Sequence, residues 1–319
     1  MKRFFYLAAL LLLFPATLSA QPAEETAPIF RKHFSLKLSG GIARWSMGDW
    51  NDYYGRQKTY MGRLRGGEGA VFYGEDFHYG IDGEAEVKYS FHPEYSLGVG
   101  IGRAWGGVGF GWDRKGSFTY DPMRYVDDDV HDETIDASIT PVLLTFYFNA
   151  PTYPNQPYLG LGVGYYFSSF QQLQDRDSYS RTDTLTADGY VMQTEGDLEF
   201  IRDAEMSAGG IGFHAVAGTE YFITPHLSFV GEIKGRYVKI SGYTGTENTD
   251  IAKPDTSWSQ DVKFVVSTRM DEDGNYKVFG FGGMAKDEPL PPSEETWRYR
   301  EGVLNFSGVA LKLGFSYHF

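Results

Sequence analysis

The clearest feature of this chain is a two-residue alternation of apolar and polar positions. Over residues 77–91, odd positions carry aromatic, aliphatic or small residues, and even positions carry charged residues, His, Gly and Ser. A helix cannot use a strict period of two, whereas a strand places alternate side chains on opposite faces. Aromatic residues stand at both ends of the apolar face, with aliphatic and small residues between them. This order is expected of a strand that faces lipid between two interfaces.

Six further segments repeat the alternation, and one more segment reads as a strand without it. The six cover residues 34–42, 97–101, 159–167, 211–221, 227–237 and 309–319. Residues 135–148 are apolar in both phases, so their outward face stays open. Glycines at every second position, 98–102 and 160–164, lack the GxGxxG spacing and the following helix of a dinucleotide-binding loop. They are expected to leave room for neighbouring side chains inside a narrow barrel.

The connections between these segments alternate in length. Short turns lie at 92–94, 149–157 and 224–226, and long polar stretches lie at 46–76, 106–133, 168–210 and 241–302. Short connections at one end and long ones at the other are typical of transmembrane barrels, with periplasmic turns and extracellular loops. We therefore predict an all-β fold: a transmembrane up-and-down antiparallel β-barrel of eight strands with long extracellular loops. An even number of strands closes the ring and pairs every backbone group without water.

A ten-stranded barrel is the alternative, because the longest stretch holds two strand-like runs at 262–266 and 276–279. An Asp-Gly pair at Asp273 and Gly274 separates them, which is a hairpin signal. The runs are too short for two aromatic belts, so we expect a hairpin above the membrane. A similar hairpin is expected around Ala187 and Asp188.

The first twenty residues read as an export signal. Lys2 and Arg3 precede an apolar run over 4–14, and small residues precede Gln21, the order of a secretory signal peptide. The run is about half of the ~20 residues that a spanning helix needs. We expect a signal peptide at 1–20 removed after Sec-type export, a periplasmic segment at 21–32 and a barrel domain at 33–319.

The end of the chain resembles the last strand of bacterial outer-membrane β-barrels. Phe315, Tyr317 and the terminal Phe319 alternate with small or polar residues, and in that family the terminal aromatic strand is the signal read by the barrel-insertion machinery. Pro225 and the glycines at 160–164 are similar to the small group of OmpA- and OmpX-like barrels. The resemblance implies the outer membrane of a Gram-negative-type bacterium, with membrane lipid and lipopolysaccharide as neighbours. The peptidoglycan-binding domain of full-length OmpA is expected to be missing.

Composition excludes several classes of function. The chain of 319 residues has a formal net charge of −13, which does not suit a nucleic-acid partner. It has no cysteine, which excludes disulfides, thiol nucleophiles and Cys-ligated zinc. No motif calls for a cofactor. An acidic run in the second long stretch is a weak candidate for a calcium site, without the spacing of an EF-hand: Asp127, Asp128 and Asp129.

Ten charged residues fall on the inward phase of the predicted strands, five acids and five bases. An eight-stranded lumen is filled by side chains, and each buried charge costs several kcal/mol unless it is paired. We therefore predict one ion-paired network in the lumen, with a route for small ions as the alternative. The ten are Lys37, Asp82, Glu84, Glu86, Lys88, Glu220, Glu232, Lys234, Arg236 and Lys312.

These observations favour a non-enzymatic barrel, structural or surface-binding through long acidic extracellular loops, whose extracellular ligand the sequence does not name. A small-solute or ion channel is the second interpretation. A lipid-modifying enzyme is the third, because some outer-membrane enzymes that resemble this fold use a His and Ser pair. His78, His214 and His318 fall on the lumen phase and lack an evident serine and acid partner at the lipid face.

Overall fold

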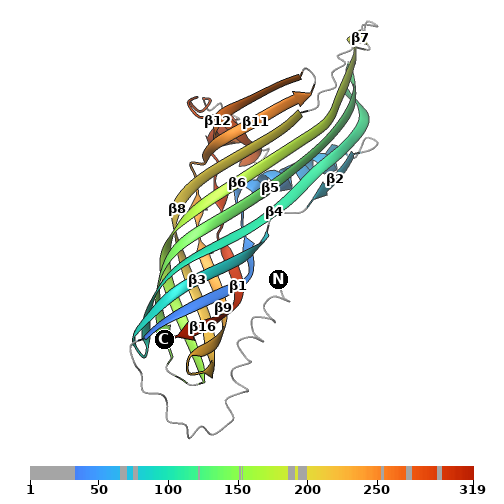
Figure 1. The fold of residues 1–319 in the computed structure, drawn as a ribbon. Coiled ribbons are helices and arrows are strands. Elements are labelled where there is room, and N and C mark those ends of the chain that lie inside the picture. The colour runs from blue at the N-terminus through green and yellow to red at the C-terminus, as the bar shows by residue number, and fades with distance from the viewer. Residues whose placement is uncertain are drawn as a thin grey trace.

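The computed structural model describes residues 33–64, 70–74, 78–120, 123–150, 152, 154–185, 191–192, 200–252, 255–270, 275–292 and 297–319. Within them, eight antiparallel strands form a closed ring (Figure 1). Around the ring the strands are β1 (His33–Trp45), β3 (Tyr79–His92), β4 (Tyr95–Tyr120), β5 (Met123–Asn149), β6 (Asn155–Leu185), β8 (Phe200–Thr224), β9 (Leu227–Tyr237) and β16 (Gly308–His318). In this part of the chain no helix is long and apolar enough to cross a membrane.

The first and last strands close the ring. Leu38 of β1 lies opposite Ala85 of β3 on one side and opposite Phe315 of β16 on the other. β6 pairs directly with β8, and β9 joins β8 to β16. Each of the eight segments predicted from the sequence overlaps one of these strands. The predicted eight-stranded antiparallel barrel is therefore confirmed.

The strands are much longer than the sequence pattern predicted. β4 and β5 stay paired from the end with the short turns as far as Tyr120 and Met123. β6 pairs with β8 as far as Arg176. The predicted loops at 106–133 and 168–210 are therefore largely strand, and the prediction of loops there was wrong. In these stretches the apolar residues change to the inner face, as at Ile135, Ala137 and Ile139, because the outer face meets water instead of lipid.

Shorter strands widen this extracellular half. β11 (Thr244–Ala252) pairs with β8, β12 (Asp255–Met270) pairs with β11, and β12 also pairs with β13 (Tyr276–Ala285) and β14 (Trp297–Glu301). The predicted hairpin of 262–266 with 276–279 is confirmed, and it lies beside the ring instead of within it. The hairpin near Ala187 is confirmed where β7 (Val191–Met192) pairs with β6. β2 (Ala70–Gly74) pairs with β4.

A helix follows the first strand of the ring, and a small two-stranded sheet forms from segments between β9 and the last strand. The helix α2 (Asp49–Leu64) lies in the stretch 46–76 that we predicted as a loop. Its buried Trp50 contacts Phe110 of β4, with ring centroids 5.5 Å apart, so the helix packs against the inner face of the wall. β10 (Lys239–Ile240) pairs with β15 (Leu304–Asn305) in a separate two-stranded sheet.

Candidate functional site

The polarity of the barrel is inside-out compared with a water-soluble protein. Leu36, Val99, Val142, Leu161 and Leu313 are exposed on its outer face. Aromatic side chains flank this apolar band. At the end with the short turns they are Phe34, Phe91, Phe146, Phe148, Phe229, Phe315, Tyr317 and Phe319, and toward the extracellular end they are Tyr79, Trp105, Tyr165, Phe167, Phe213 and Tyr237. An apolar band between two aromatic girdles matches the outer face of a transmembrane barrel.

The structure also settles the orientation of β5, which the sequence left open. Val142, Leu144, Phe146 and Phe148 face outward, whereas Leu143 and Tyr147 are buried in the lumen. The strand is apolar in both phases because its inner face lies against aromatic and aliphatic lumen residues over much of its length.

All ten charged residues predicted for the lumen are buried there, between 1% and 8% exposed. They form ion pairs that connect strands across the barrel. In the middle layer, Lys37 of β1 donates to Glu232 of β9 at 3.0 Å and lies 3.4 Å from Glu86 of β3. The phenol of Tyr147 donates to both oxygens of Glu86, at 2.9 and 2.8 Å, and Tyr158 donates to Glu232 at 2.8 Å. Two carboxylates thus enclose one ammonium group.

The next layer toward the extracellular end joins three bases to two acids. Glu84 accepts hydrogen bonds from Lys234 at 2.5 Å and from Lys312 at 2.7 Å. Lys312 also lies 3.0 Å from Asp82, which pairs with Arg236. Because Lys312 contacts both acids, the charges of this layer form one connected cluster.

The layer nearest the short turns contains the remaining pair and a histidine. Lys88 of β3 pairs with Glu220 of β8. His318 Nε2 lies 3.4 Å from Glu220 and 3.1 Å from the hydroxyl oxygen of Ser228. Ser90, Ser96 and Asn149 form a neighbouring group of buried hydrogen bonds.

The alternating glycines provide space for these side chains. A Cβ atom on Gly98 would lie 2.7 Å from the carboxyl carbon of Glu86, and one on Gly162 would overlap the ring of His214. A Cβ on Gly160 would lie 2.9 Å from Tyr147. The side chains of the network fit inside the barrel because these positions of the wall carry no side chains of their own.

The cluster of Ser228, His318 and Glu220 does not have the geometry of a nucleophilic triad. In a triad the acid holds one ring nitrogen of the histidine and the other nitrogen takes the proton of the serine. Here Glu220 and Ser228 both approach Nε2, and Nδ1 has no hydrogen-bond partner within the described part of the chain. Ser228 is also completely buried, so a substrate carbonyl has no path to it.

Above the charged layers the barrel interior becomes an apolar core that the sequence did not reveal. It includes Trp45 of β1, Trp50 and Tyr54 of α2, Phe264 of β12 and Phe306, all at most 2% exposed. We call this core, together with helix α2, the plug. A polar cluster lies on the wall beside it, where His131 Nε2 is 3.3 Å from Glu133 and Glu133 also accepts from Gln172. Burial, and then the charge of Glu133, raise the pKa of Tyr53 in the helix.

An ion pair between the partly exposed Arg300 and the buried Asp49 fixes the start of the plug helix. The two terminal guanidinium nitrogens of Arg300, Nη2 and Nη1, donate to Asp49 at 2.5 and 2.6 Å, and the backbone N–H of Val303 donates to the same carboxylate at 2.9 Å. Such bidentate, charge-assisted bonds are among the stronger polar contacts in proteins. The segment that follows β14 is thereby tied to the first turn of α2.

Two substitutions in this first turn should have opposite effects. Asp49→Asn removes the bidentate pair, and we expect the plug helix to lose about 2 kcal/mol of local stability. Burial and the neighbouring Asp49 raise the pKa of Asp52. Its charge therefore opposes folding above that raised pKa, and Asp52→Asn should protect the helix slightly at neutral pH. Hydrogen exchange of the α2 amides measures both, and a shift of the same sign in the two variants would contradict this assignment.

The residues of the predicted assembly signal lie on the outer face of the final strand. Phe315, Tyr317 and Phe319 are 54%, 47% and 71% exposed, and the backbone N–H of Phe319 donates to Phe34 at 2.9 Å. Phe319 thus contributes one hydrogen bond and little burial to the finished barrel. Their role in assembly stays a prediction.

Deleting Phe319 should impair assembly in cells much more than refolding. We expect severalfold less folded protein in the membrane fraction, with near-normal refolding yield in detergent micelles. Heat-dependent gel mobility reports the folded fraction in both settings. Deletion of Phe319 with no loss of assembly in cells would remove the assembly role.

Two predictions lie outside the described residues. The signal peptide at 1–20 and the segment 21–32 cannot be placed. The acidic run Asp127–Asp129 lies in β5, but its side chains are outside the described part. No group of three or more metal-binding side chains occurs among the described residues.

A closed ring of eight antiparallel strands, an apolar exterior with two aromatic girdles and a charged interior together define a small transmembrane β-barrel. No family model and no curated protein sequence matches the chain. Several solved structures are similar, among them three bacterial outer-membrane proteins. A major outer membrane protein from Thermus thermophilus is 13% identical over 91% of this chain and 100% of its own, with a TM-score of 0.35. OprG from Pseudomonas aeruginosa is 12% identical over 91% of this chain and 97% of its own, also with a TM-score of 0.35. CarO from Acinetobacter baumannii is 13% identical over 78% of this chain and 96% of its own, with a TM-score of 0.30.

Proposed function

We propose that this chain is a non-conducting outer-membrane barrel that holds a broad β-sheet wall at the surface of a Gram-negative-type cell. One observation carries the proposal: the lumen is filled by the ion-paired layers and, above them, by the apolar plug. The proposal includes export through the signal peptide, insertion by the barrel machinery through Phe319, and contact with lipid and lipopolysaccharide.

The outer face supports the membrane location. Exposed apolar side chains surround the ring in a continuous band, and a soluble protein rarely exposes an apolar patch of more than a few hundred Å². Closure of the sheet leaves no unpaired edge within the band, which is the condition for a sheet to cross a bilayer.

The interior supports a closed lumen over a channel. Lys37 and Glu232 are 2% and 5% exposed, and Lys312 is 1% exposed, so water has almost no access to the charges that a conducting pore would present to ions. Trp50 and Phe306 are fully buried above them. A channel would need both layers to move.

The extracellular half supports a binding role for the wall. Exposed acids recur along its outer face on β5, β8, β11 and β12, at Asp136, Glu205, Asp250 and Asp261. A surface that carries charge of one sign attracts cationic partners and repels anionic ones. We propose that the acidic wall is the part of the molecule that contacts other molecules outside the cell, and that the barrel itself performs no catalysis.

Electrical recording from refolded protein in a planar bilayer tests the closed lumen. We expect no discrete conductance steps from the wild-type chain. Carbonate-resistant association with liposomes verifies insertion, and a reference porin added to the same bilayer verifies that steps are detectable. Reproducible steps from an inserted, folded barrel would favour the channel instead.

A further inference from the structure

The outer wall has two hollows that meet at a single arginine. The first has a volume of about 610 Å³ and lies over β9, β16, β1, β3 and β4. The second, of about 720 Å³, crosses β4, β5, β6, β8 and β11. Arg103 of β4 lines both. We infer that they form one binding site for a phosphorylated glycolipid of the outer leaflet, an inference that rests on the proposed outer-membrane location.

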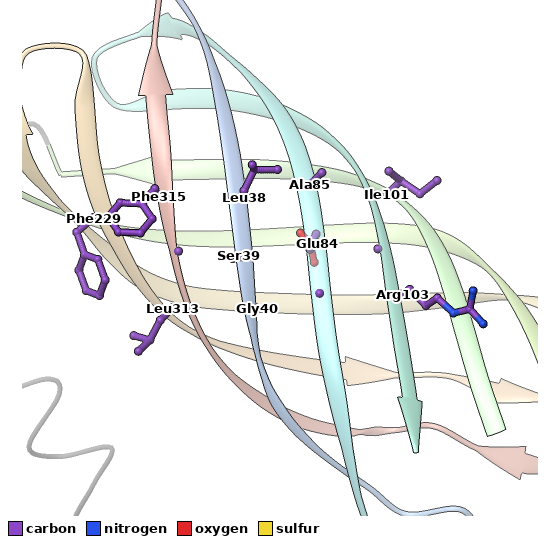
Figure 2. Close-up of a pocket in the computed structure, with 13 residues that line it drawn as sticks. Leu38, Ser39, Gly40, Glu84, Ala85, Ile101, Arg103, Phe229, Leu313 and Phe315 are labelled. Carbon is purple, nitrogen blue, oxygen red and sulfur yellow. The ribbon is translucent and has the colours of Figure 1, made fainter. Parts of the chain in front are cut away.

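The first hollow suits an acyl chain. Its floor includes Gly40 of β1 and Gly83 of β3, which lie opposite each other in the sheet. Figure 2 shows Leu38, Ile101 and Leu313 standing around this floor, with Arg103 at one end. The carboxylate of Glu84 belongs to the lumen, where it pairs with Lys234 and Lys312, and does not serve the hollow. An apolar depression within the lipid-facing band matches a hydrocarbon chain.

Arg103 suits the phosphate. It faces outward between Ile101 and Trp105, and its guanidinium makes no hydrogen bond or ion pair with any described residue. Among the described residues it is also the only lysine or arginine that lines either hollow. A cation is costly in hydrocarbon, but Trp105 belongs to the aromatic girdle, so Arg103 lies near the interface. A guanidinium there binds phosphate through two parallel hydrogen bonds.

The second hollow suits a sugar. The sheet register places four hydroxyl side chains in one row across the strands, at Ser138, Ser169, Ser207 and Thr244. The hydroxyls of Ser138 and Ser169 are 2.8 Å apart. Two residues farther from the membrane, the carboxylates of Asp136 and Glu205 line the same groove. Small hydroxyl residues leave room, and carboxylates accept hydrogen bonds from hydroxyl groups of a ligand.

The charges give the ligand one orientation. Asp136 and Glu205 would repel a phosphate group, so the phosphate must lie at the Arg103 end and the sugar must extend into the groove. A ligand with an acyl chain, a phosphate and several hydroxyl groups uses every part of the site. A plain phospholipid would leave the hydroxyl row without a partner, which is why we assign a glycolipid.

Native mass spectrometry of the full chain, refolded in mild detergent, tests the site. The ligands are an acylated, bisphosphorylated glucosamine disaccharide, its dephosphorylated form, and phosphatidylglycerol. We expect the bisphosphorylated disaccharide to bind at least about tenfold more tightly than the other two, a difference of about 1.4 kcal/mol. Arg103→Ala should remove about the same factor, and Arg103→Lys should restore part of it.

Substitutions in the hollows test the other two parts. A Cβ on Gly83 would have no atom nearer than 3.9 Å, so Gly83→Leu should fill the first hollow without disturbing the backbone and weaken binding severalfold. Glu205→Gln should weaken only ligands with sugar hydroxyls. Arg44→Ala and Gly235→Leu are matched controls, because both positions face outward and line neither hollow. They should bind as the wild type does.

Three results would overturn the site. These are equal binding by Arg103→Ala and Arg44→Ala, equal binding of phosphatidylglycerol and the disaccharide, or no binding to a barrel whose gel mobility indicates folding. Each would leave the outer-membrane proposal standing. Failure of the wild-type chain to fold or insert in detergent or liposomes would instead count against that proposal.

Discussion

Replacing Glu84 with glutamine should lower the free energy of unfolding by about 3–5 kcal/mol, the cost of breaking a buried ion pair by removing one partner. Glu84 accepts from both Lys234 and Lys312, and all three side chains are at most 8% exposed. Glutamine keeps the shape but leaves two ammonium groups with less compensating charge. Urea titration in detergent micelles, followed by tryptophan fluorescence and gel mobility, measures the loss.

The matched control is Asp261→Asn, an exposed acid on β12, which should change stability by no more than about 0.5 kcal/mol. A double-mutant cycle with Lys312→Met tests the network itself. Removing both partners should cost clearly less than the sum of the single changes, because the second substitution removes a charge that the first left unpaired. Strict additivity would mean that these charges act independently.

Replacing Trp50 with alanine should destabilise the extracellular half by about 3–5 kcal/mol, the cost of deleting a large buried aromatic side chain. Trp50 is fully buried and contacts Phe110 and Tyr53. The plug lies beyond the ion-paired layers, so its loss should leave the membrane-spanning barrel folded. We expect hydrogen exchange in α2 to accelerate strongly while exchange in β1 and β16 stays slow.

Trp258→Ala is the control for this substitution, because Trp258 lies on β12 in the same half and is 44% exposed. It should have little effect on exchange in α2. A uniform loss of protection in all strands after Trp50→Ala would mean that the plug and the barrel unfold as one unit, contrary to this expectation.

The membrane-spanning strands could be predicted from the sequence because lipid imposes the alternation that identifies them. A strand such as β3 must place apolar residues outward at every second position, from Tyr79 to Tyr89. That constraint ends at the interface. Beyond it, β4, β5, β6 and β8 run between water and the plug, and apolar residues move to the inner face, as at Ile135, Ala137 and Ile139, so the lipid-facing pattern that identifies a strand is lost.

The polarity of the stretch 46–76 predicts a loop and hides the plug helix. Trp50, Tyr53 and Tyr54 lie at positions i, i+3 and i+4, the spacing of one face of a helix. Asp49 occupies the first turn, where an acid favours helix formation. These signals were present, although nothing in the sequence says that this helix packs inside a barrel.

The inward charges could be predicted one by one, but their partners could not. Lys37 pairs with Glu86 on the adjacent β3 and also with Glu232 on β9, which is not its neighbour in the ring. Contacts across the lumen depend on how the sheet curves and staggers as it closes. A single sequence contains the alternation of each strand but not that stagger.

The pairing of β1 with β16 has a consequence for the order of events during biogenesis. The first strand of the ring cannot acquire its second neighbour until β16 has been synthesised. Until then two strand edges stay open, and open edges readily pair with other chains. Before the ring closes, the polypeptide must therefore stay in a form that withholds those edges, and closure joins two strands that lie far apart in the sequence.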